Sequence, residues 1–117
     1  MKNDLRDFLT DIIDYAGNAR NIVRSNDLKH LSEKFSPEGL SLERSMEIIG
    51  EAVKQVPQEI REKYPQIPWK QIAGLRDILI HRYWSAQMAR LVDIVENYLP
   101  DLEEVVKQIL EDLNLDQ

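Results

Sequence analysis

The sequence predicts an all-α fold, an antiparallel up-and-down bundle of four main helices with short accessory helices. Apolar residues recur every three or four positions through nearly the whole chain, a spacing typical of amphipathic helices. No stretch of four or more residues alternates apolar and polar side chains convincingly, as a half-buried strand would. The connections between the helical stretches are short, which favours antiparallel neighbours.

Four apolar stripes mark the main helices, and they cover in order residues 4–24, 41–56, 69–84 and 87–113. Asn3 or Asp4 is a suitable N-cap for the first. Gly50 interrupts the second at a cost of about 1 kcal/mol relative to alanine, which indicates that a neighbouring backbone approaches closely there. We expect the fourth helix to be kinked or restarted at Pro100, since proline removes a backbone donor from a helix interior. Short helical pieces are expected at residues 27–35 and 57–64.

Length and composition limit the possible classes of protein. A chain of 117 residues has room for one domain, which we place at residues 1–117. The absence of cysteine excludes disulfides and thiolate metal sites. The charged N-terminal stretch does not fit a signal peptide, and no apolar run reaches the roughly 18 residues that a membrane span needs. We therefore expect a soluble, cytoplasmic protein with no membrane partner.

Charge is distributed unevenly along the chain. The whole chain has a formal net charge of −6, but residues 57–90 contain six Lys or Arg and only three Asp or Glu, a local balance of +3. Residues 91–117 contain one basic and eight acidic residues, a balance of −7. The basic segment has the sign that suits an anionic or phosphate-containing substrate.

The basic segment contains the unusual stretch "GLRDILIHRYW", residues 74–84. On a straight helix with about 100° per residue, Arg76 and Tyr83 would lie inside the apolar stripe. His81 would lie beside Asp77, an i, i+4 pair that can hydrogen-bond. Arg76 and His81 would be about 140° apart on such a helix. A site that uses both therefore needs a helix break, a long arginine reach or two subunits.

Two interpretations of Arg76 remain open on geometry alone. In the first, Arg76 pairs with a glutamate of a neighbouring helix, Glu47 or Glu51, because a buried arginine is costly without a partner. In the second, the stripe meets a second copy of the same surface, and a two-fold dimer brings two copies of each reactive group to one cleft.

The residue types point to phosphodiester chemistry. Histidine can give or take a proton near neutral pH, and a nearby aspartate can fix its tautomer. Arginine holds phosphate oxygens through a bidentate fork. Tyrosine can donate a hydrogen bond or stack on a base. A basic, metal-free set of Arg76, Asp77, His81 and Tyr83 suits phosphodiester cleavage better than redox or acyl-transfer chemistry.

The stretch "RDILIHRY" also resembles the R-x-x-x-x-H-x-Y signature of HEPN-domain proteins, and its tyrosine resembles the HepT branch. The similarity extends over residues 45–84, including "EIIGEA" and the "IPW" that precedes the signature. HepT-like proteins are the toxins of MntA/HepT toxin–antitoxin systems, and these systems are referred to below as type VII-like. The resemblance implies a helical bundle that dimerises across the signature helices.

For the activity, the resemblance implies metal-independent RNA cleavage without a cofactor, in which the ribose 2′-hydroxyl attacks the adjacent phosphate. It implies that His81 is the general acid/base and that Arg76 stabilises the phosphorane. Asp77 would support the signature. Tyr83 would complete the site and be the residue to which a cognate MntA-type nucleotidyltransferase attaches AMP to silence the toxin.

Two positions depart from the family pattern. Asp77 stands where this branch often has asparagine, and "SAQMARLVD", residues 85–93, differs from the usual continuation. The carboxylate makes the local charge less favourable to RNA. An alternative function is therefore a non-catalytic helical partner or scaffold of a nucleotidyltransferase. A third is a structural bundle in which Arg76 has an internal partner.

Overall fold

A computed structural model of the chain describes residues 4–79 and 84–115, and these residues form eight helices and no strand. The four long helices are α1 (Leu5–Ser25), α3 (Pro37–Val53), α7 (Trp84–Asn97) and α8 (Leu99–Leu115). The four short helices are α2 (Leu28–Leu31), α4 (Gln58–Arg61), α5 (Trp69–Ala73) and α6 (Leu75–Leu79). The all-α prediction is confirmed.

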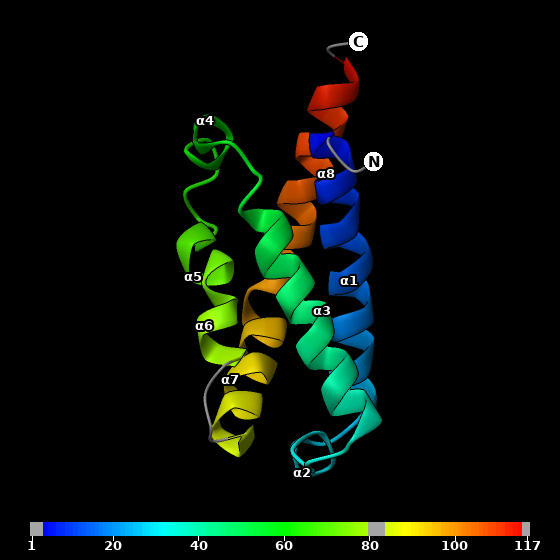
Figure 1. Cartoon of the computed structure of the whole chain (residues 1–117). Helices are drawn as coiled ribbons and strands as arrows, with labels where there is room; N and C mark the ends of the chain where they lie inside the picture. The colour runs from blue at the N-terminus through cyan, green and yellow to red at the C-terminus, as the bar shows by residue number, and fades with distance from the viewer. Residues whose placement is uncertain (1–3, 80–83, 116–117) are drawn as a thin grey trace.

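The helices run up and down along an elongated molecule of 46 × 28 × 22 Å (Figure 1). α1 leaves the end where both termini lie, α3 returns toward it, and α5 with α6 runs away from it again. α7 and α8 follow one another back to the end with the termini. The bundle therefore has four antiparallel passes, with the third made of two short helices and the fourth made of two longer ones.

The fourth pass restarts near the predicted position. α7 ends at Asn97 and α8 begins at Leu99, so that Pro100 lies in the first turn of α8. Proline is tolerated in a first turn because its missing N–H would have no acceptor within the helix. The apolar phase continues across the break, and Val95, Leu99 and Leu102 are all buried.

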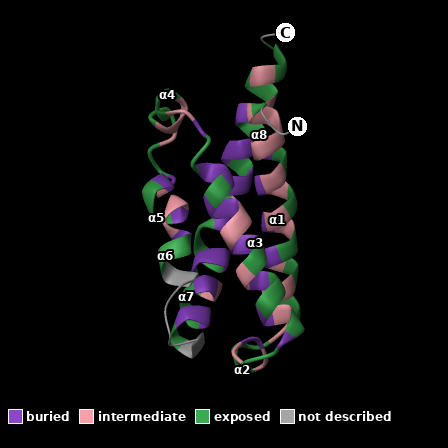
Figure 2. Cartoon of the chain, in the orientation of Figure 1, coloured by how far each residue is buried: buried purple, intermediate pink, exposed green. Residues whose placement is uncertain are grey.

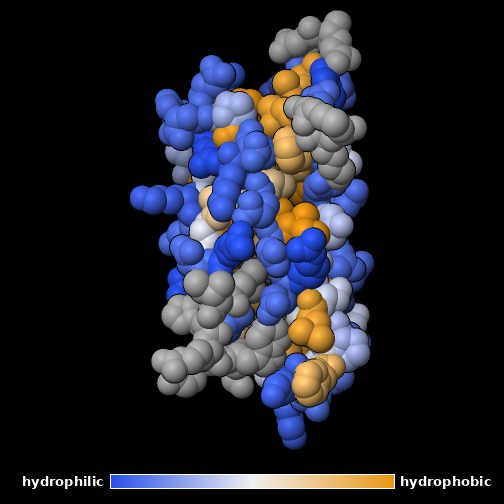
Figure 3. Space-filling view, viewed as in Figure 1, coloured by the Kyte–Doolittle hydropathy of each residue, from blue (hydrophilic) through white to orange (hydrophobic). Residues whose placement is uncertain are grey.

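The core lies between α1, α3, α7 and α8, whose buried residues face one another (Figure 2). Its fully buried large side chains come from every pass of the bundle: Leu9, Ile12, Leu31, Leu42, Met46, Ile49, Ile72, Leu75, Met88, Leu91, Leu99 and Leu102. Hydrophilic residues cover most of the face shown in Figure 3, where the hydrophobic ones form small separate patches. No helix among the described residues is both long and apolar enough to cross a membrane.

The second main helix begins earlier than the sequence pattern predicted. α3 starts at Pro37 instead of Ser41, because Ser36 is its N-cap and accepts a hydrogen bond from the Gly39 N–H at 3.0 Å. It ends at Val53 instead of Val56. The apolar stripe missed both boundaries because it records which residues are buried, whereas a cap is set by hydrogen bonding.

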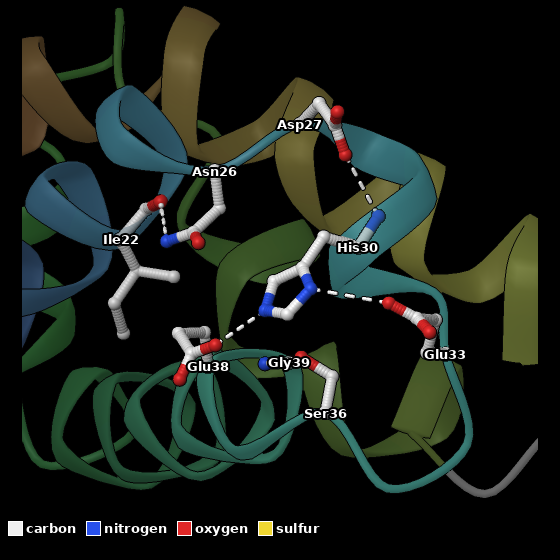
Figure 4. Close-up of polar contacts among 8 residues, drawn as sticks. All are labelled: Ile22, Asn26, Asp27, His30, Glu33, Ser36, Glu38 and Gly39. Carbon is white, nitrogen blue, oxygen red and sulfur yellow. Dashed lines mark hydrogen bonds and ion pairs between the residues drawn. The ribbon is translucent and has the colours of Figure 1, made fainter.

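The junction between α2 and α3 is held by a histidine between two carboxylates (Figure 4). His30 Nδ1 lies 3.1 Å from the Glu33 carboxylate, and its Nε2 contacts the Glu38 carboxylate. The hydrogen bond with Glu38, followed by the contacts with Glu33, raises the pKa of His30 above its ordinary value of 6.5. His30 itself is partly exposed.

Polar contacts also join the long helices. Asn18 of α1 donates to the Ser45 hydroxyl of α3 at 2.9 Å. Arg20 of α1 donates to both oxygens of Glu103 in α8, at 3.0 and 2.9 Å. Glu103 is only 7% exposed, so α1 supplies the charge that compensates its burial.

Candidate functional site

The third pass is broken at Gly74, within the stretch that the sequence singled out. α5 ends at Ala73, Gly74 has φ −87° and ψ 11°, and α6 begins at Leu75. Glycine is a poor helix former, and here its N–H donates to the Lys70 carbonyl at 3.0 Å to close α5. The expectation of one continuous helix from Trp69 onward is therefore wrong.

Arg76 lies two residues after the break, and its side chain is exposed in this subunit. Ile72 and Leu75, on either side of Gly74, are buried, whereas Arg76 and Asp77 are exposed. The angular placement of Arg76 inside the apolar stripe assumed a straight helix, and the break at Gly74 removes that assumption. The contact of this stripe with a second copy of the chain stays a prediction. The exposed position of Arg76 makes the guanidinium accessible to a ligand or to a second chain.

Helix α3 supports the broken segment from behind. A Cβ built on Gly50 would lie 3.1 Å from the Ile72 carbonyl oxygen and 3.3 Å from the Leu75 Cβ. The close backbone approach predicted at Gly50 is thus confirmed, and the neighbour that approaches is the α5–α6 junction. This packing fixes the position from which Arg76 and Asp77 project.

Arg76 does not form the internal ion pair that was one of the two interpretations. Glu47 is paired with Arg44 at 3.1 Å, and Glu51 is paired with Lys54 at 3.1 Å, both within α3. Among the residues that the structure describes, none forms an ion pair with Arg76. Of the signature's charged groups, Arg76 and Asp77 are therefore presented outward by this subunit.

His81 and Tyr83 lie outside the described residues, as does the side chain of Trp84. In the sequence, His81 and Tyr83 fall between Leu79, the last residue of α6, and Trp84, the first residue of α7. Their distances from Arg76 and Asp77, and the dimer contact across this segment, remain predictions.

A cavity of about 370 Å³ opens beside the signature, between the α5–α6 segment and α7 with the residue that follows it. Its nine lining residues include one guanidinium, two carboxylates, one amide and one phenol: Pro68, Gln71, Ile72, Gly74, Asp77, Arg90, Asp93, Ile94 and Tyr98. Asp77 connects the two features, because it belongs to the signature and also lines the cavity. The arrangement can bind a ligand that offers both hydrogen-bond donors and acceptors.

Sequence reasoning did not single out Arg90, Asp93 or Tyr98. Arg90 and Asp93, three positions apart, lie on one face of α7, and Tyr98 follows the end of that helix, but many surface helices have such spacing. This face becomes a cavity wall only because α7 lies opposite the α5–α6 segment, which is about twenty positions earlier in the sequence. Within the described parts of the chain, no group of three or more His, Asp or Glu side chains could hold a metal ion.

Comparison with known proteins places the sequence in a family. The sequence model of the family described as "Ribonuclease HepT-like" matches residues 3–109. The chain is 35% identical over 112 residues to "Putative RNase MJ0125" of Methanocaldococcus jannaschii, with 96% of each chain covered. It is 40% identical over 116 residues to "Putative RNase MJ0127" of the same organism, with 92% of each covered.

A further relative, whose sequence matches over a shorter stretch, carries the name HepT. The chain is 40% identical over 60 residues to "Probable ribonuclease HepT" of Thermococcus cleftensis, covering 51% of this chain and 54% of the relative. No solved structure matches the chain significantly. The family match extends over most of the sequence and includes the α5–α6 segment, and on this evidence the chain belongs to the HepT-like ribonuclease family.

Proposed function

We propose that this chain is a metal-independent endoribonuclease that acts as a homodimer and is the toxin of a type VII-like toxin–antitoxin system. Its membership of the HepT-like ribonuclease family supports RNA as the substrate. The observation that carries the proposal is the exposure of Arg76 and Asp77 at the Gly74 break, where this subunit gives Arg76 no described ionic partner.

The proposed reaction uses only groups of the protein and the RNA. The His81 imidazole takes the proton from a ribose 2′-hydroxyl, and the oxygen attacks the adjacent phosphorus. A bond from O2′ to phosphorus forms as the bond from phosphorus to O5′ breaks, and an imidazole in its protonated form supplies the proton to O5′. Arg76 donates hydrogen bonds to the phosphorane oxygens, whose negative charge grows in the transition state.

A homodimer would bring the reactive groups of two subunits together. Two copies related by a two-fold axis would place two imidazoles and two guanidinium groups in one cleft, so that one imidazole acts as base and the other as acid. In this arrangement Asp77 supports the neighbouring histidine and Tyr83 completes the site. Light scattering should then give a mass twice that of the chain.

The experiment that tests catalysis compares variants in EDTA. Purified protein is incubated with a long RNA beside His81→Ala, Arg76→Ala and Arg24→Ala, the last being an exposed arginine of α1 outside the signature. We expect cleavage by the unmodified protein and by Arg24→Ala, and a loss of at least about a hundredfold in the other two. Equal cleavage by all four proteins, or none by any, would contradict the proposed enzyme.

Regulation by adenylylation has a separate test. We propose that an MntA-type nucleotidyltransferase transfers AMP from ATP to the Tyr83 hydroxyl, releasing pyrophosphate and silencing the toxin. Intact mass measured after incubation with that enzyme and ATP should rise by one adenylyl group. A Tyr83→Phe variant should show no increase, and an unchanged mass of the unmodified protein would contradict this step.

A second candidate function follows from the carboxylates near the signature. Asp77 and Asp93 both line the cavity beside Arg76's helix, and their charges oppose the approach of a phosphate. The chain would then be a non-catalytic partner or scaffold of the nucleotidyltransferase. Adenylylation of Tyr83 in a protein that never cleaves RNA is the result that would favour this function.

A further inference from the structure

The cavity beside the signature holds a preorganised acceptor. Asn97 Nδ2 donates to one carboxylate oxygen of Asp93 at 2.6 Å and to the Asp93 backbone carbonyl at 3.0 Å. These bonds fix the carboxylate on α7 at the cavity wall, and its oxygens keep lone pairs for a ligand. Asp93 is therefore positioned to accept hydrogen bonds from a group that carries donors.

Arg90 lies one helical turn before Asp93 and lines the same cavity. Side chains three positions apart on a helix start about 5–6 Å from each other. No residue in the described portion of the chain forms an ion pair with Arg90. One wall thus presents a planar donor fork next to a carboxylate acceptor.

The balance of charge favours a base over a phosphate as the occupant. Two carboxylates, Asp77 and Asp93, face one guanidinium, so a bare phosphate would meet net repulsion. A neutral nucleobase would meet no such repulsion. Its edges carry both acceptors for the guanidinium and donors for the carboxylates. The volume of about 370 Å³ lies within the range of small-ligand pockets and accommodates a purine.

Guanine is the base whose edges match this wall. Its N7 and O6 form an acceptor pair that arginine binds through two parallel hydrogen bonds. Its N1–H and 2-amino group form an adjacent donor pair that a carboxylate can accept. Adenine and cytosine each place an acceptor next to their amino group, and uracil has a single N–H between two carbonyls. A carboxylate therefore repels part of the Watson–Crick edge of each of them.

The rest of the lining suits the flat faces of a base. Pro68 and Ile94 supply apolar surface, and Tyr98, 37% exposed, has a ring on which a base can stack. Gly74 has no side chain to fill the space. We propose that this cavity is a guanine-binding subsite for the RNA substrate, with Arg90 bound to N7 and O6 and Asp93 bound to N1–H and the 2-amino group.

The inference rests on the proposed ribonuclease function, because Asp77 lines the subsite and belongs to the signature. A guanine held there would place a neighbouring phosphate near Arg76. The consequence is a preference for cleavage next to guanosine. The subsite can be tested by binding, which needs no catalysis, and by mapping cuts, which does.

The binding test uses GMP, IMP, AMP and CMP in NMR titrations of the whole chain. IMP keeps N1–H, O6 and N7 but lacks the 2-amino group. We expect GMP to bind about tenfold tighter than IMP, AMP or CMP, since one good bidentate pair discriminates by about that factor or more. Asp93→Asn should lose the difference between GMP and IMP. Glu96→Gln is the matched control, because it removes one carboxylate from the same helix outside the cavity and should leave the preference unchanged.

The cleavage test maps cut sites in an RNA of mixed sequence. We expect cuts next to guanosine that lose their base preference in Arg90→Met but keep it in Arg24→Met. Selective GMP binding without any cleavage would support the subsite and contradict the ribonuclease. Cleavage without base preference, together with equal or absent binding of the four nucleotides at millimolar concentration, would overturn the subsite while leaving the ribonuclease in place. If Asp93→Asn fails to fold, the GMP to IMP ratio of the unmodified protein still decides between these outcomes.

Discussion

Gly50 of α3 and Ile72 of α5 are in backbone contact, since a Cβ on Gly50 would lie 3.1 Å from the Ile72 carbonyl oxygen. Through this contact the third pass of the bundle packs, or is seated, on α3 at a point two residues before the break at Gly74. The glycine in the interior of α3 thus stands where a neighbouring backbone comes too close for a larger side chain. The position of Arg76 and Asp77 depends on this seat.

Replacement of Gly50 by alanine should therefore fail to give the usual helical gain in stability. Gly17→Ala is the matched control, because no atom beyond the neighbouring backbone of α1 lies within 4 Å of the Cβ that it adds. We expect Gly17→Ala to raise the free energy of unfolding by up to about 1 kcal/mol, and Gly50→Ala to leave it unchanged or lower it. Urea unfolding measures both, and equal gains would mean that the α5–α6 segment does not pack on Gly50.

Replacement of Gly39 by alanine should be more damaging. The added Cβ would lie 2.2 Å from the carbonyl oxygen of Leu31, a backbone atom that cannot swing away. The first turn of α3 would have to move from α2, at a cost of roughly 1–3 kcal/mol, as for other overpacked sites. Thermal unfolding should show a lower midpoint for Gly39→Ala than for Gly50→Ala, and the reverse order would contradict the close approach of α2 to α3.

Removal of the Glu103 carboxylate should loosen the contact between α1 and α8. Arg20 binds both oxygens of this nearly buried group, and its own side chain is 37% exposed. We expect Glu103→Ala to lower the free energy of unfolding by about 1–2 kcal/mol, a modest value because the guanidinium still reaches water. Glu104→Ala, at an exposed neighbouring position, should change it little. Equal effects of the two variants in urea unfolding would argue against the ion pair.

The His30 cluster predicts a pH dependence of stability. The hydrogen bond with Glu38 raises the pKa of His30 in the folded protein above its ordinary value of 6.5. The protonated form is thus favoured by folding, and its contribution is complete below the unfolded pKa while Glu33 and Glu38 remain ionised. It is lost as the pH rises through the raised folded pKa.

The measurement compares the unmodified protein with His30→Gln from pH 6 upward. We expect the difference in unfolding midpoint to be largest at the acidic end and to shrink as the pH increases. A difference that stays constant over this range, or grows with pH, would show that His30 is not held in its protonated form by the two carboxylates.

The sequence by itself determined the helical class and the order of the passes, and it supplied the candidate reactive residues, whose roles stay a prediction. Helical periodicity is a local property, so the apolar stripes and Pro100 predicted where helices run. The arginine, histidine and tyrosine of the signature are identified directly from the sequence. Gly50 could be interpreted for the same reason, since glycine in a helix interior needs a compensating contact.

Only the tertiary structure decided that Arg76 and Asp77 are exposed and what lies across from Asp77. The sequence pattern assumed a straight helix and put Arg76 among the apolar residues, whereas in the structure the helix is broken at Gly74 and Arg76 is exposed. The cavity joins Asp77 to Arg90 and Asp93, which belong to another pass of the bundle. Such a site depends on how separate helices pack, and periodicity within one segment contains no information about that.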